Sequence, residues 1–60
     1  MTKQEWESLR DKFALAKQAF SMKQKELPGY EPYAIAKYVF DGLENVAAAM
    51  AEEAEDAHVA

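Results

Sequence analysis

Two lines of apolar residues at heptad spacing, separated by a Pro-Gly-Tyr-Glu-Pro segment, constrain the fold of this 60-residue chain more than any other feature. Steps of three and four residues place side chains on one face of an α-helix, because such residues lie over one another along the helix axis. The sequence therefore predicts an all-α, antiparallel two-helix hairpin. The first line is Trp6, Leu9, Phe13, Ala16 and Phe20, and the second is Tyr33, Ala36, Phe40, Leu43, Ala47, Met50, Ala54 and Ala57.

Local signals mark the ends of both predicted helices. Thr2 followed by Glu5 is a capping-box pattern, which satisfies free backbone amides at a helix start. Pro28 disfavours helical conformation at the residue before it, and Gly29 suits the left-handed conformation that often ends a helix. Pro32 fits the first turn of the next helix, where its missing amide hydrogen is not needed.

These signals predict one helical-hairpin domain over residues 1–60. A connection this short brings two helices together as antiparallel neighbours. The expected order is a helix over residues 3–26, a turn over 27–31, a helix over 32–54 and a frayed acidic tail over 55–60.

The chain is too small to bury a large core by itself. A domain of this size buries only about 60% of the surface that its unfolded chain exposes, and small scaffolds need a covalent, metal or protein partner. Cysteine is absent, which excludes disulfides, while half of the residues are apolar. We therefore expect association with another protein chain, and a homodimer that forms a four-helix bundle.

A second apolar line makes the surface wider than one hairpin seam requires. A helix that is apolar over most of its circumference is normally covered on two sides. Gly42 lies in this line although glycine costs about 1 kcal/mol in a helix interior, so we expect it to admit a second helix at close range. The predicted partner or dimer interface consists of Leu15, Met22, Ile35, Val39, Gly42, Val46 and Ala49.

Charge divides the chain into a basic part and an acidic part. The first 25 positions hold six basic and three acidic residues, and the remaining positions hold one basic and eight acidic residues. Helices of opposite sign favour antiparallel pairing and steer a charged partner. Lys3, Arg10 and Lys17 recur every seven residues and form an alternative nucleic-acid face, because such a row can follow phosphates.

The opening Met-Thr-Lys-Gln-Glu, the length and the predicted hairpin resemble the small plasmid copy-number proteins that bind paired RNA loops as four-helix dimers. The resemblance covers five residues and contains no functional motif. The chain departs from it at Trp6, in the Pro-Gly turn and in its acidic second helix, so no residue role is transferred. It implies an architecture, and it supplies the alternative function of a dimeric RNA-binding regulator.

The sequence contains no pattern typical of catalysis. Glu55 and His58 have the Glu-x-x-His spacing of di-iron bundles. Such sites need further carboxylates that project into a bundle core, whereas these two residues lie in the acidic tail. Nucleophile–base pairs, metal-ligand clusters and phosphate loops are also missing. We expect no enzyme activity, no cofactor, and neither a catalytic nor a metal site.

The expected function is that of a small protein–protein interaction module that binds a larger partner and modulates or inhibits it. Acidic, cysteine-free chains of this size are typical of accessory regulators encoded by phages and plasmids, an association that rests on size alone. An oligomerisation module without a regulated target is a third reading. The polar start and the absence of a long apolar run predict a cytoplasmic protein without a membrane partner.

Overall fold

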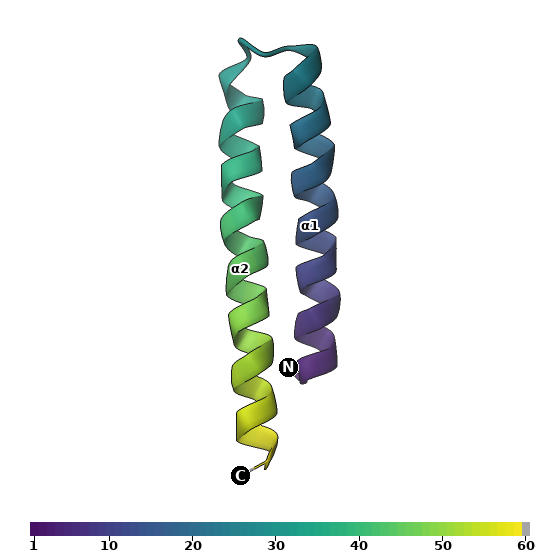
Figure 1. Ribbon diagram of the computed structural model, residues 1–60, viewed down its shortest axis with the longest axis vertical. Helices are drawn as coiled ribbons and strands as arrows, with labels where there is room; N and C mark the ends of the chain where they lie inside the picture. Colours follow the sequence, from purple (N-terminus) through teal and green to yellow (C-terminus); the bar gives the residue numbers. More distant parts are fainter. Residues whose placement is uncertain (60) are drawn as a thin grey trace.

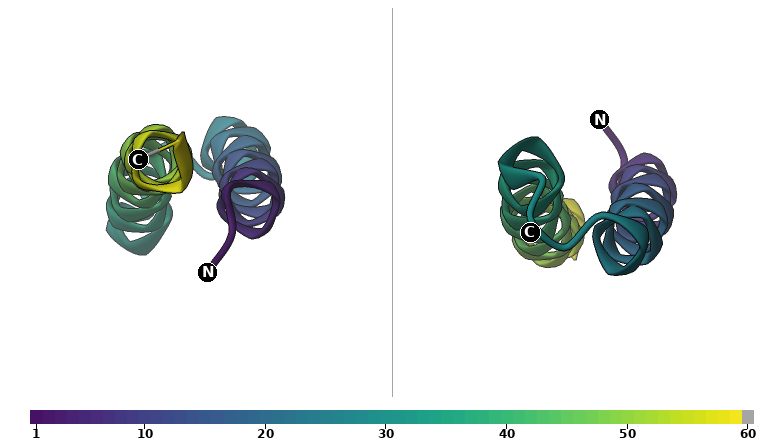
Figure 2. Two further views of the ribbon diagram at one scale, coloured as in Figure 1. Left: turned by 90° about the horizontal axis from the view of Figure 1, so that it is seen from below. Right: turned by 90° about the horizontal axis from the view of Figure 1, so that it is seen from above.

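The protein is an antiparallel hairpin of two helices, as the sequence predicts. The computed structural model describes the backbone of residues 1–59 and the side chains of residues 1–54. Helix α1 spans Lys3–Glu26 and helix α2 spans Glu31–Val59. They lie side by side along the whole length of α1 (Figure 1), in a molecule of 49 × 13 × 12 Å. Views along the helix axes show the same two helices and no third layer (Figure 2).

The start of α1 is fixed by the predicted capping box. The Glu5 N–H donates to Thr2 Oγ1 at 3.2 Å, and the Thr2 N–H donates to Glu5 Oε1 at 2.8 Å. The Thr2 carbonyl accepts the first helical hydrogen bond, from the Trp6 N–H at 3.0 Å. The hydrogen bond from the Thr2 N–H lowers the pKa of Glu5, because it stabilises the charged carboxylate. Two backbone amides that have no helical partner are thereby satisfied.

The turn between the helices differs in one detail from the prediction. The Leu27 N–H still donates to the Lys23 carbonyl, and the Leu27 carbonyl then accepts from the Tyr30 N–H at 3.0 Å. Among the described residues no glycine has a positive φ, so the expectation of a left-handed Gly29 was wrong. The reason is that this hydrogen-bonded turn at Leu27 reverses the chain without needing a left-handed residue. Helix α2 starts at Glu31, one residue earlier than expected.

Helix α2 is longer than expected. Its backbone is helical to Val59 instead of ending near residue 54. Alanine and glutamate, which are strong helix formers, make up most of residues 47–55, and the helix formed there continues to Val59. The predicted frayed tail over 55–60 lies outside the residues whose side chains the structure describes.

Aromatic rings fill the half of the seam nearer the turn. The Phe40 ring lies between Phe13, at a centroid distance of 6.1 Å, and Phe20, at 5.8 Å. Phe20 also contacts Tyr33 at 6.1 Å, and Tyr33 makes an edge contact with Tyr30 at 4.7 Å. Such ring pairs add to the free energy of burial. The placement of Phe13, Phe20 and Phe40 in the hairpin seam is confirmed.

Small residues form the other half of the seam. Ala47 and Ala51 are the buried apolar residues among those described, with 1% and 4% of their surface exposed. Because Phe40 lies midway between Phe13 and Phe20, the antiparallel register places the large Trp6 level with Ala51. A bulky side chain on α1 therefore coincides with small ones on α2.

One of the residues expected in the seam lies at its margin. Leu43 is 36% exposed and Met50 is only partly buried, while Glu44 and Ala51 occupy the positions next to α1. An α-helix has about 3.6 residues per turn, so a strict heptad line drifts away from the partner helix unless the pair supercoils. The prediction of Leu43 as a seam residue was wrong for this reason. Met50 is as partly buried as Phe13, Phe20 and Phe40, and its place in the seam stays a prediction.

Replacing Phe40 with alanine tests the aromatic half of the seam. The lower end of the usual loss in the free energy of unfolding for a Phe→Ala substitution is about 3 kcal/mol. We expect this lower value because the Phe40 ring is only partly buried. Thermal unfolding followed by circular dichroism should show a lower midpoint and reduced helicity.

Tyr38→Ala is the matched control, because Tyr38 is 81% exposed. It should change the free energy of unfolding by less than about 0.5 kcal/mol. Equal effects of the two variants would contradict the seam described here.

Candidate functional site

An apolar flank of α2 is left uncovered by α1. We call it the α2 stripe; its exposed members Ile35, Val39 and Val46 have 56%, 48% and 56% of their surface accessible. The spacing of its residues keeps them on one side of the helix, away from Asp41 on the opposite side. The full α2 stripe is Ile35, Val39, Gly42, Leu43, Val46 and Met50.

Gly42 has no structural explanation within the hairpin. It is exposed, and a Cβ atom built on it would meet nothing within 4 Å. Alanine would fit at this position and would favour the helix. The hairpin itself therefore does not require a small residue at Gly42.

Leu15 and Met22 form a separate apolar pair on α1, which we call the α1 outer pair. They are 66% and 63% exposed and are seven residues apart, so they lie on one line along the helix. Phe13 and Phe20, two residues earlier, contact α2, which places Leu15 and Met22 on the outer side of α1. The predicted interface residues therefore fall on two surfaces. Ala49 is exposed as well, seven residues beyond Gly42.

The flank of the hairpin opposite the α2 stripe is polar, and Lys17 bridges the two helices there. Its Nζ lies 3.2 Å from Asp41 Oδ1 and 2.7 Å from Glu44 Oε1. Glu44 Oε1 is sealed from solvent and makes no aligned hydrogen bond, so charge attraction is what holds this contact. The two carboxylates, Glu44 first, raise the pKa of Lys17. These contacts cross from α1 to α2.

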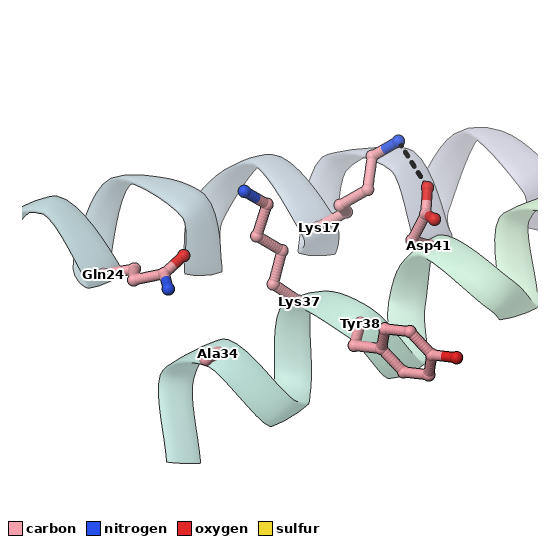
Figure 3. A pocket seen from close by; sticks show the side chains of 6 residues that line it. All are labelled: Lys17, Gln24, Ala34, Lys37, Tyr38 and Asp41. Carbon is pink, nitrogen blue, oxygen red and sulfur yellow. Dashed lines mark hydrogen bonds and ion pairs between the residues drawn. The ribbon is translucent and has the colours of Figure 1, made fainter. Parts of the chain in front are cut away.

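A shallow groove of about 390 Å³ runs beside this ion pair (Figure 3). Lys37 extends from α2 toward α1, while the Tyr38 ring points away from the groove's centre. Basic and acidic groups are mixed along it, so it has no single charge preference. The lining residues are Lys17, Gln24, Ala34, Lys37, Tyr38 and Asp41.

The alternative nucleic-acid face is largely engaged in contacts within the chain. Lys17 is held by two carboxylates, and Arg10 pairs with the adjacent Asp11 at 3.1 Å. Lys3 is exposed as the first residue of α1. A row of cations that are already paired with carboxylates is a poor binding site for phosphates, because the carboxylates repel the backbone of a nucleic acid.

The described residues contain no group of three or more histidine, cysteine or acidic side chains arranged to hold a metal ion. Glu55 and His58 lie outside the described side chains. In the same part of the chain, neither helix is long and apolar enough to span a membrane. No family model matches the chain, and neither a curated protein nor a solved structure matches it.

Sequence reasoning missed Glu44 and Tyr38. Glu44 lies three residues after Asp41 and shares Lys17 with it. Two acids at this spacing opposite a basic residue of the antiparallel helix are the signal that could have identified the ion pair. Tyr38 had no signal, because a single aromatic residue among polar neighbours fits both an exposed and a covered position.

Lys17→Met tests the ion pair across the seam. The methionine keeps an apolar stem but leaves Glu44 without its counter-charge, so the melting temperature should fall more than in Lys37→Met, which removes the same charge from the same groove. Adding Glu44→Leu to Lys17→Met should recover stability, because an apolar pair replaces the unpaired acid. Equal melting of the two single variants would contradict the role of Lys17.

The pH dependence of the same variants gives an independent check. Because the pKa of Lys17 is raised above its ordinary value of 10.5, its contribution to stability is fully present below that pH and is lost as the pH rises through the higher folded value. The difference in melting temperature between wild type and Lys17→Met should be constant from neutral pH to about pH 10 and should then shrink. A difference that grows above pH 10.5 would show that the ion pair does not raise this pKa.

Proposed function

We propose that this protein is a non-catalytic, cytoplasmic protein–protein interaction module, a small acidic regulator that binds a larger partner protein and modulates or inhibits it. We further propose that it works as a homodimer in which two hairpins form a four-helix bundle. The observation that supports this proposal is the contrast between its buried and exposed apolar residues. Among the described residues two alanines are buried, whereas ten large apolar side chains are exposed.

The accessible area of the hairpin supports the same proposal. The chain exposes 4611 Å², about 650 Å² more than the roughly 3,950 Å² expected of a compact protein of 6.8 kDa. One side of a standard protein interface buries about 800 Å². The excess is thus close to what one protein partner covers.

The distribution of apolar residues favours a protein over a nucleic acid as the ligand. The α2 stripe and the α1 outer pair are apolar, whereas Arg10 and Lys17 of the basic row are paired with acids. An apolar surface is stabilised by burial against another protein. It gains little from a phosphate backbone.

Charge placed on the α1 outer pair tests binding of the larger partner. The tagged protein should capture a specific partner from host lysate, with and without nuclease, and the double variant Leu15→Lys with Met22→Lys should lose at least tenfold of that capture. Gln4→Lys with Gln18→Lys adds the same charge at exposed polar positions of α1 and should retain it.

Nucleic-acid binding is the outcome that would overturn the proposal. Capture that disappears after nuclease treatment, falls steeply with salt, and is lost in Arg10→Glu with Lys17→Glu would assign the function to the basic row.

A further inference from the structure

We infer that the α2 stripe is covered by the α2 stripe of a second copy of this chain, packed antiparallel about a two-fold axis that passes beside Gly42. This inference rests on the proposed function, and it specifies which surface joins the copies and in which orientation. It assigns the α1 outer pair to the outside of the dimer.

The stripe is symmetric about its own centre. Val39 and Val46 lie one turn on either side of the point between Gly42 and Leu43, and Ile35 and Met50 lie two turns on either side. A two-fold interface requires a self-complementary surface, in which each residue meets the symmetry-related one. Antiparallel packing sets Val39 against the partner's Val46, and Ile35 against the partner's Met50.

Gly42 stands where such an axis needs a small residue. Symmetry-related backbones come closest at the axis, and glycine allows the closest approach of two helices. Because a Cβ at Gly42 would meet nothing within the chain, the second copy supplies the missing reason for a glycine. Each of the six positions of the stripe is uncharged, so the acidic groups of the two α2 helices stay outside the contact.

Helix α1 is compatible with the same axis. Glu5 and Lys23 lie about five full turns apart, on one line along the flank that adjoins the α2 stripe. Their midpoint, near residue 14, is level with Gly42, because residues 13–17 lie beside residues 40–44 in the hairpin. One two-fold axis therefore brings each Glu5 to the partner's Lys23 while it pairs the stripes. Lys12 lies on the same line, seven residues after Glu5, and comes close to the partner's Lys12 at the axis. The charges of α1 therefore both favour and oppose this packing, and the symmetry of the α2 stripe is what selects a second copy.

Cysteine cross-linking tests both the occupant and its orientation. The chain has no cysteine, so single-site variants report one contact each. Gly42→Cys should form a disulfide-linked dimer under mild oxidation. Ile35→Cys alone and Met50→Cys alone should not cross-link with a short bifunctional maleimide, because each lies about 20 Å from its own copy along the antiparallel helices. The two variants refolded together should give the cross-linked heterodimer.

Lys37→Cys, on the opposite flank beside the groove, is the control and should stay uncross-linked with both reagents. Cross-linking of Ile35→Cys with itself would indicate parallel packing and would overturn the inference. The inference would also be overturned by two results together. The wild-type chain would sediment as a monomer at 100-fold the concentration used for capture, and the mixture of Ile35→Cys and Met50→Cys would give no cross-linked dimer. Partner capture and its loss in Leu15→Lys with Met22→Lys are measured separately, so failure of the dimer and failure of the proposed function are distinguishable.

Discussion

The structure depends on a single seam between two helices, and every other feature follows from how little that seam can bury. Aromatic rings stack in the half nearer the turn, where Phe40 lies between Phe13 and Phe20. In the other half, buried Ala47 and Ala51 face α1. Ordering the backbone of the hairpin costs about 1 to 2 kcal/mol of conformational entropy per residue. Nearly all of its large apolar side chains nevertheless keep contact with water. The hairpin is thus an incomplete core.

The two flanks of the seam differ in how they are closed. On one flank Lys17 joins α1 to Asp41 and Glu44 of α2, so the charges of these three residues are paired within the chain. Among the residues whose side chains the structure describes, the ion pairs that join the two helices lie on that flank. The α2 stripe is exposed on the other. This asymmetry favours the α2 stripe as the side on which we propose that the chain associates. A charged flank resists burial because its ions would lose water, whereas an apolar flank gains from it.

Most of the fold could be predicted because its signals are local. The capping box at Thr2 and Glu5, the break at Pro28 and the line through Phe13, Phe20 and Phe40 act within a few residues. The errors arose where geometry accumulates along the chain. Because a straight helix drifts relative to a heptad repeat, Glu44 lies in the place expected for Leu43. The sequence of each helix alone also does not show how the two helices are rotated against each other, so it could not reveal that Leu15 and Met22 lie on a different surface from Val39. The identity of the partner is not encoded in any local pattern, so the interface remains a proposal.

The concentration dependence of thermal unfolding tests most directly whether association completes the core. Binding that occurs only in the folded state stabilises it by mass action. Melting curves of the wild-type chain, recorded by circular dichroism over about a hundred-fold range of protein concentration, should show a midpoint that rises steadily with concentration. A cooperative transition with the same midpoint throughout that range would mean that the single hairpin is stable alone, and it would contradict this account.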